Sequence, residues 1–268
     1  MTTKTMVKPA ATAAPARTPL MVTVTAKRLI SPRMARITFT GEVLGHFGYD
    51  GPDHLARLFL PSASGRLTLP VTTDWWPEMR AMPLENRPIL RNYTARRLDR
   101  ARQELDIDFV LHGDGSPASA WALQAAPGDQ IGVLSDGAEY APPADTDWQL
   151  IAGDATAIPA ISSIVERFSS GTRAVVLIEV ADAADEVDIT APDGVDVRWL
   201  HRQGTGPRGV RVVEALRSTD FPLGDVYAWV AGESTLATSV RRYLVKERHI
   251  AKSRIYFCGY WRVGSKAY

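Results

Sequence analysis

The feature that most restricts the fold of this chain is a change of hydrophobic rhythm near its middle. In the first half, apolar and polar residues alternate in short runs between turn residues, which is typical of strands with one face in water. In the second half, continuous apolar runs alternate with segments whose apolar residues recur at helical spacing. We therefore expect an antiparallel barrel followed by a parallel sheet with helices on both faces.

The expected boundary is Pro142-Pro143, which opens a polar stretch between the two rhythms. The sequence thus predicts a disordered tail at 1–20, a barrel domain at 21–143 and an α/β domain at 144–268. With 268 residues, each domain is long enough to bury its own core. The tail is rich in Thr, Ala, Pro and Lys and lacks a continuous apolar segment, so we expect a disordered tail and not a secretion signal.

The individual elements follow from the same patterns. The expected barrel strands lie at 21–30, 34–39, 56–60, 89–97, 103–111 and 130–134, with a short helix at 118–125 and a loop-rich region at 62–88. In the second half, the expected strands lie at 148–152, 174–180, 195–200, 226–231 and 255–258, and helices begin near 158, 210 and 232.

Charge and cysteine content exclude several classes of protein. Lys plus Arg number 31 and Asp plus Glu number 30, so no overall basic field would attract nucleic acid or a membrane surface. The single cysteine, Cys258, excludes a disulfide framework, a cysteine-ligated iron–sulfur cluster and a multi-thiolate zinc site, and favours the reducing cytosol. No run approaches the roughly 20 apolar residues that cross a bilayer. We expect a cytoplasmic protein without stable membrane association.

One barrel strand carries a motif suited to a flat, anionic ligand. Arg91 and Arg96 could fork onto phosphate oxygens, Tyr93 could cover a planar ring, and Thr94 could hydrogen-bond the edge of that ring. Together these side chains describe a site for a flavin dinucleotide. A surface strand with solvated arginines and a half-buried tyrosine fits the same residues equally well.

A second motif leads from a strand into a helix at residues 112–119. Its glycines leave the backbone N–H groups of the helix start open to a pyrophosphate, although Ser116 and Pro117 also fit an ordinary capped helix. His112 lacks a carboxylate partner in the sequence pattern, so we assign it to binding and not to proton transfer. Trp121 either packs on the cofactor or belongs to the core.

Two strand-to-helix turns of the second half are candidates for the nicotinamide end of a dinucleotide. Residues 153–160 follow the first strand at the edge where α/β sheets bind nucleotides, but they lack the three-glycine fingerprint. The segment 231–234 repeats the arrangement, with Glu233 serving either the ligand or only its helix. The aromatic and basic cluster at 259–264 either covers a flavin or packs as part of the core or tail.

With these segments in view, the chain resembles the siderophore-interacting protein family, flavoproteins related to the ferredoxin reductases that reduce ferric siderophores with NAD(P)H. The resemblance runs in order through residues 31–36 with 40–41, 91–96, 110–122, 127–129, 153–161, 231–233 and 259–262 with 264. It implies an N-terminal antiparallel Greek-key β-barrel that binds FAD and a C-terminal Rossmann-like α/β domain that binds NAD(P)H.

The resemblance also implies roles for individual residues. On the FAD side it implies contacts from Arg91, Asn92, Tyr93, Thr94, Arg96, Asp108, Val110, Leu111, His112, Ala118, Ser119 and Trp121. Tyr93 would pack on the isoalloxazine and Thr94 would lie near its N5 edge. In the NAD(P)H cleft it implies Asp154, Thr156, Ala157 and Glu233, with Tyr260 and Trp261 closing on the flavin. The chain departs from the family at 135–138, where it has Ser-Asp-Gly-Ala in place of a Gly-Pro pair with a following glycine.

The implied reaction passes a hydride from NAD(P)H to FAD and then electrons singly to Fe(III) held by a siderophore, with no catalytic acid and no metal ligand required of the protein. Candidates for holding an anionic ferric siderophore are Lys27, Arg262 and Lys266. Arg173, Arg202 and Arg208 could meet a 2′-phosphate, so NADH and NADPH both remain open. A general flavin reductase or diaphorase and a non-enzymatic siderophore carrier are the alternatives, and we expect a monomer.

Overall fold

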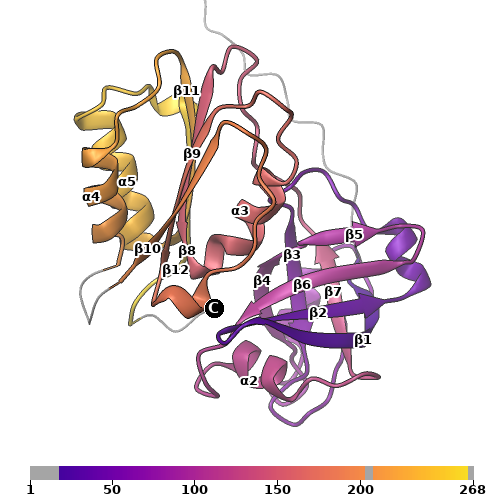
Figure 1. Ribbon diagram of the computed structural model, residues 1–268. Helices are drawn as coiled ribbons and strands as arrows, with labels where there is room; N and C mark the ends of the chain where they lie inside the picture. Colours follow the sequence, from indigo (N-terminus) through magenta and orange to yellow (C-terminus); the bar gives the residue numbers. More distant parts are fainter. Residues whose placement is uncertain (1–17, 203–207, 265–268) are drawn as a thin grey trace, which may run out of the picture.

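The computed structural model describes residues 18–202 and 208–264, so residues 1–17 of the tail predicted at 1–20, and Lys266, lie outside them. The end predicted for that tail was too late, because a strand already begins at Leu20. Figure 1 shows two parts, a curled antiparallel sheet and a parallel sheet covered by helices. This confirms the predicted architecture of a barrel followed by an α/β domain. The change between the two falls between strands ending at Ser135 and beginning at Trp148.

Seven antiparallel strands form the first part, in the spatial order β4-β3-β7-β1-β2-β6-β5. Their bounds are β1 Leu20–Ser31, β2 Met34–Thr40, β3 Leu55–Leu60, β4 Ile89–Thr94, β5 Arg97–Asp99, β6 Glu104–Val110 and β7 Gln130–Ser135. Alternate side chains such as Val22, Ile37 and Ile107 fill one interior cluster and are fully buried. A 3-10 turn η1 (Glu42–His46) and helix α2 (Pro117–Gln124) complete this domain.

The strand expected at 89–97 is two strands in the structure. At Ala95 the chain leaves β3 and passes to β6, because the Ala95 N–H donates to the His54 carbonyl (2.8 Å) and the Arg96 N–H donates to the Asp106 carbonyl (2.9 Å). The alternation of side chains continues across this change of partner, so the sequence pattern does not reveal it.

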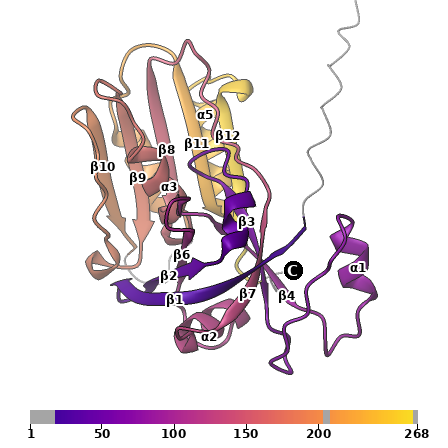
Figure 2. The same ribbon diagram turned by 90° about the vertical axis from the view of Figure 1, so that its right-hand side faces the viewer.

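A helix, α1 (Trp75–Ala81), lies within the region expected to be loop. Figure 2 shows it projecting from the barrel, away from the parallel sheet. Trp75 packs edge-on against Phe59 (5.5 Å between ring centroids), and the Glu78 carboxylate accepts the N–H groups of Val71 and Thr72, both at 2.9 Å. These contacts stabilise a short helix that contains a proline and has no long apolar period.

Five parallel strands form the second part, in the order β10-β9-β8-β11-β12. Their bounds are β8 Trp148–Asp154, β9 Ala174–Val180, β10 Val195–His201, β11 Val226–Glu233 and β12 Ile255–Trp261. Helices α4 (Val210–Ser218) and α5 (Ser234–Lys246) cover one face, and α3 (Ile158–Val165) covers the face toward the barrel (Figure 1). Short 3-10 turns are η2 (Ala155–Ala157), η3 (Ala183–Asp185) and η4 (Lys252–Arg254).

Apolar packing and buried polar bonds join the two domains. Met34 and Val110 of the barrel pack into the cluster beneath α3. The Trp229 indole N–H donates to the Asp53 carboxylate at 2.9 Å, and both residues are buried. This interface sets the carboxyl ends of β8 and β9 opposite the β1–β2 turn and the end of β6.

Candidate functional site

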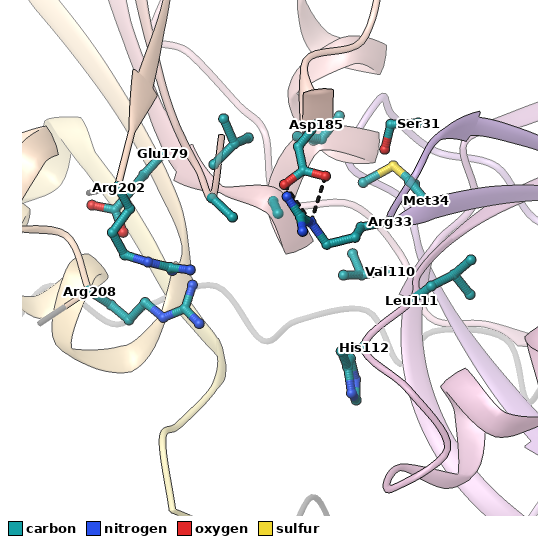
Figure 3. A pocket seen from close by; sticks show the side chains of 14 residues that line it. Ser31, Arg33, Met34, Val110, Leu111, His112, Glu179, Asp185, Arg202 and Arg208 are labelled. Carbon is teal, nitrogen blue, oxygen red and sulfur yellow. Dashed lines mark hydrogen bonds and ion pairs between the residues drawn. The ribbon is translucent and has the colours of Figure 1, made fainter. Parts of the chain in front are cut away.

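A pocket lies at the junction of the two domains, where the barrel faces the carboxyl edge of the parallel sheet (Figure 3). Its barrel side is formed by Ser31, Arg33, Met34, Val110, Leu111 and His112. Its sheet side is formed by Ala155, Ile158, Glu179, Val180, Ala181, Asp185, Arg202 and Arg208. The pocket therefore brings together two of the predicted motifs, the end of β6 and the turn after β8.

The order of the parallel strands reverses direction at β8 and β11, and such switch points are where α/β sheets bind ligands. Asp154 ends β8 there and is 2% exposed. One carboxylate oxygen accepts the Thr156 N–H (2.9 Å) and hydroxyl (2.6 Å), and the other accepts the Glu233 N–H (2.8 Å). Burial raises the pKa of Asp154, while these hydrogen bonds act in the opposite direction.

The adjacent β11 turn is built in the same way. Glu233 is 1% exposed and caps α5, accepting the N–H groups of Thr235 (2.5 Å) and Leu236 (3.2 Å). Gly232 has φ of 137°, and a Cβ there would lie 2.8 Å from the Asp154 carboxyl carbon, so the close approach of the two turns requires glycine. Asp154 and Glu233 thus bind backbone N–H groups of the two turns that lie at the switch point.

The C-terminal aromatics take different places in the structure. The Trp261 indole N–H donates to Asp154 (3.1 Å), and the Arg208 guanidinium lies 5.2 Å from the Trp261 ring centroid. Trp261 therefore lies against the turn after β8, and its contact with a flavin stays a prediction. Tyr260 is 39% exposed, and its contact with a flavin stays a prediction.

On the barrel side, the predicted ring-binding residues pack as one aromatic group. Tyr93 lies 4.5 Å from Phe109, and Trp121 lies 5.7 Å from Phe109, measured between ring centroids. Trp121 thus contributes to the barrel core. Thr94 is buried at the end of β4, and Arg91 shares a side of the strand with Tyr93 because alternate residues point the same way. Burial raises the pKa of the Tyr93 phenol and lowers the pKa of Arg91.

The start of α2 fits a pyrophosphate. Ser116 is the N-cap residue, but its side chain makes no capping bond, which leaves the first N–H groups of the helix for a ligand. Gly113 has φ of 84°, and the space within 4 Å of a Cβ at Gly113 or Gly115 is open. Ser119 fixes this loop, because its hydroxyl accepts the His112 N–H (3.0 Å) and donates to the Gly113 carbonyl (2.6 Å). The free N–H groups at the start of α2 and the open space beside Gly113 and Gly115 suit the phosphates of FAD.

Two predicted cofactor residues are engaged elsewhere. Asp108 accepts two hydrogen bonds from Arg36 (2.6 and 2.8 Å), and Arg96 pairs with Glu166 of the α/β domain (2.5 Å). Asp108 alternates with the core residue Phe109 and so points to the outer face of the barrel. Arg96 also lies 3.8 Å from Asp108, so this network joins the domains, and the cofactor contacts of Arg96 and Asp108 stay predictions. The Asn92 side chain accepts a bond from Arg57 (3.2 Å).

Two of the three predicted siderophore-binding cations, Lys27 and Arg262, lie within the described residues. The Lys27 ammonium donates to the Leu123 carbonyl (2.9 Å) and the Ala122 carbonyl (3.4 Å), so it caps the C-terminal end of α2. Arg262 is exposed just after β12, and Lys266 lies outside the described residues. Ala157 is fully buried in η2 and approaches Gly153 so closely that only glycine fits there.

The sequence analysis named Arg202 and Arg208 of the pocket lining but missed Arg33, Glu179 and Asp185. Arg33 donates to both oxygens of Asp185 (2.8 and 2.8 Å) and also pairs with Asp182. Glu179 is buried at the end of β9, and its carboxylate accepts the Gly209 N–H (3.1 and 3.0 Å). An acid inside the apolar run 174–180 was the available signal for Glu179. The Arg33 pairing joins residues 152 positions apart and left no local signal.

The chain was compared with known proteins. Family models described as siderophore-interacting FAD-binding domain and siderophore-interacting protein match residues 23–140 and 146–264. Ferric vibriobactin reductase of Vibrio cholerae is 36% identical, over 89% of this chain and 87% of that protein. The NADPH-dependent ferric-chelate reductase of Escherichia coli is 30% identical, over 87% and 88%. A siderophore utilization protein from T. fusca has a crystal structure with TM-score 0.83 and 35% identity, over 94% of this chain and 95% of that chain.

Proposed function

The chain belongs to the siderophore-interacting protein family, and we propose that it is an NAD(P)H-dependent, FAD-containing oxidoreductase that reduces siderophore-bound Fe(III) to Fe(II). The observation that carries this proposal is the pocket between the domains. It places the end of β6, which leads into the predicted pyrophosphate loop, opposite the sheet edge where a dinucleotide would bind.

The barrel residues would hold FAD by three kinds of contact. Arg91 and the uncapped start of α2 would bind the phosphates, and Tyr93 and Thr94 would meet the ring and its edge. When bound, FAD accepts a hydride and passes electrons on one at a time. The side chains around it position the partners and exclude water, because the redox chemistry belongs to the cofactor.

The α/β domain would hold the nicotinamide end of NAD(P)H at the β8 and β11 turns. Buried Asp154 and Glu233 keep these two turns in contact, and Thr156 is fixed by the Asp154 carboxylate. Their backbone would align the donor with the flavin across the pocket. Since a domain shift of 1 Å can be costly for hydride transfer, the bonds of Asp53 and Arg33 across the junction would contribute to rate through positioning.

We further propose a ferric siderophore as the electron acceptor, in the cytoplasm, with the protein acting as a monomer. Lowering the charge of the iron weakens its attraction to anionic oxygen ligands, so reduction releases it. Exposed Arg262 directly follows Tyr260 and Trp261 in the chain and is our candidate for meeting an anionic complex. Arg262→Ala should raise the KM for an anionic ferric siderophore and leave ferricyanide reduction unchanged, whereas equal losses with both acceptors would contradict this role. No helix among the described residues has the length and apolarity needed to span a membrane.

The decisive experiment follows the flavin absorption band of the purified protein under anaerobic conditions. Addition of NADH or NADPH should bleach the band, and a ferric siderophore with a ferrous-iron trap should restore it and yield trapped Fe(II). Bleaching without Fe(II) would favour another acceptor, as in a general diaphorase. A protein that is purified without flavin and binds none would contradict the reductase proposal and favour a carrier.

A further inference from the structure

We propose that Ser163 and Glu166, at the C-terminal end of α3, are positioning residues for hydride transfer from NAD(P)H to FAD. The inference rests on the proposed function and adds the residues that set the relative position of its two ligands. Both side chains bind Arg96 of the barrel, two residues after Thr94, for which we predict a place at the flavin edge. Helix α3 itself follows the turn after β8, where we predict that the nicotinamide binds.

The backbone that follows Thr94 is held from both domains. The Arg96 N–H donates to the Asp106 carbonyl of β6 (2.9 Å), and the Arg96 carbonyl accepts the Ser163 hydroxyl (2.9 Å). The Arg96 guanidinium donates to the Glu166 carboxylate (2.5 Å) and to the Ser163 hydroxyl oxygen (3.4 Å). Ser163 is 2% exposed, and the Arg96 side chain is 11% exposed, so these contacts lie largely out of water. The segment beside the predicted flavin edge is therefore fixed to α3.

The opposite end of α3 is held at the predicted nicotinamide turn. The Asp154 carboxylate accepts the N–H (2.9 Å) and the hydroxyl (2.6 Å) of Thr156. A Cβ at Gly153 would lie 2.6 Å from the Ala157 side chain, so the turn and the start of the helix are tightly packed. All eight residues of α3 are buried, and Figure 1 shows the helix between the parallel sheet and the barrel. Such a helix, about 12 Å long at about 1.5 Å per residue, is displaced as a unit, so a shift at one end reaches the other.

The position of these bonds distinguishes them from the other contacts across the junction. The Asp53 bond ends on Trp229 of β11, and the Arg33 ion pairs end in the segment after β9. The bonds of Ser163 and Glu166 instead join the segment beside the predicted flavin edge to the helix that begins at the predicted nicotinamide turn. A displacement of 1 Å between reacting groups can cost about a hundredfold in rate, so a shift of about 0.5 Å costs about tenfold. The two side chains would therefore act on the rate through Arg96 and α3, without touching either reacting ring.

The test measures anaerobic flavin bleaching by stopped-flow absorbance in the FAD-loaded full chain, with whichever of NADH and NADPH bleaches the wild type faster. In Ser163→Ala and in Glu166→Gln, we expect the limiting rate at saturating donor to fall about tenfold. The donor concentration that gives half of this rate should stay within about twofold of the wild type, because neither side chain binds the donor. Ferricyanide should reoxidise the dithionite-reduced variants at the wild-type rate, since that step involves no nicotinamide. The long-wavelength charge-transfer band of the reduced protein with the oxidised dinucleotide should weaken, because it reports the overlap of the two rings.

Ser162→Ala is the matched control. Ser162 is 3% exposed in the same helix, and among the described residues no hydrogen bond joins its hydroxyl to the barrel, so this variant should keep the limiting rate of the wild type. Glu166 lies nearer the surface than Ser163, so Glu166→Gln tests the proposal even where Ser163→Ala does not fold.

A limiting rate of Glu166→Gln within about twofold of the wild type would overturn the proposal. A loss in Ser163→Ala no larger than that in Ser162→Ala, or an equal loss in ferricyanide reoxidation, would overturn it as well. Each of these results leaves the reductase function standing when the wild type is bleached. A wild type that neither NADH nor NADPH bleaches would overturn the proposed function itself.

Discussion

Replacing Asp53 by Asn should destabilise the protein at the junction of its domains. Asp53 is 7% exposed, and one carboxylate oxygen accepts the backbone N–H groups of Glu139 (3.1 Å) and Tyr140 (3.0 Å). The other oxygen accepts the Trp229 indole N–H (2.9 Å). Asparagine has a single acceptor oxygen, so when it serves the two backbone groups its amide N–H₂ faces the indole donor.

The magnitude follows from the bonds that are lost. A hydrogen bond to a charged acceptor contributes about 1.5–3 kcal/mol, and a buried donor left without a partner costs about 1–3 kcal/mol. Since part of each cost is relieved by local rearrangement, we expect the free energy of unfolding to fall by about 3 kcal/mol, which lowers Tm by roughly 6–12 °C for a chain of this size.

Calorimetric unfolding of the FAD-loaded wild type, Asp53→Asn, Trp229→Phe and the double variant measures this effect. Trp229→Phe removes the indole N–H, so adding Asp53→Asn to it should cost about 1–2 kcal/mol less than in the wild type. The stacking of Trp229 on Tyr256 (6.0 Å) is present in both proteins of the first comparison and absent from both proteins of the second, so it cancels. An Asp53→Asn cost below about 0.5 kcal/mol, or strictly additive costs of the two substitutions, would refute the reasoning.

Three further predictions concern the cofactor loop and the edge of the parallel sheet. Ser119→Ala removes both hydrogen bonds that fix the loop before α2 and should weaken FAD binding about tenfold in a fluorescence titration. Ser116→Ala loses no capping bond and should bind FAD like the wild type. Equal losses of FAD affinity in the two variants would contradict the role of Ser119 in this loop. Gly232→Ala forces a Cβ against Asp154 at φ of 137° and should lower the free energy of unfolding by at least about 2 kcal/mol in denaturant titrations, while Gly45→Ala, with open space around it, should cost less than about 0.5 kcal/mol. The raised pKa of Asp154 means that the folded state holds this proton more tightly than the unfolded chain does, so the free energy of unfolding should fall as pH rises from the ordinary value of 3.8 through the raised one. Asp154→Asn should flatten this part of the pH profile, and an unchanged slope would contradict the assignment.

The order of the two domains and most of their strands were predictable from the sequence, because hydrophobic periodicity is set by the local backbone and by which face is buried. The comparisons confirm the family, the fold and the FAD-binding domain, and the reductase names of the relatives agree with the predicted chemistry. The sequence analysis missed helix α1, which depends on the packing of Trp75 against Phe59. It also predicted β4 to be too long, because the strand changes its partner at Ala95.

The sequence by itself determined which segments carry the candidate chemistry, since glycine turns, aromatic pairs and strand ends are local properties. Only the tertiary structure decided what each charged side chain does there. Arg96 is joined to Glu166, 70 residues away, and Glu179 is bound by the N–H of Gly209, 30 residues away. A buried charge is stabilised by whichever partner the fold brings within hydrogen-bonding distance, so its role follows from contacts between distant segments that no local pattern records.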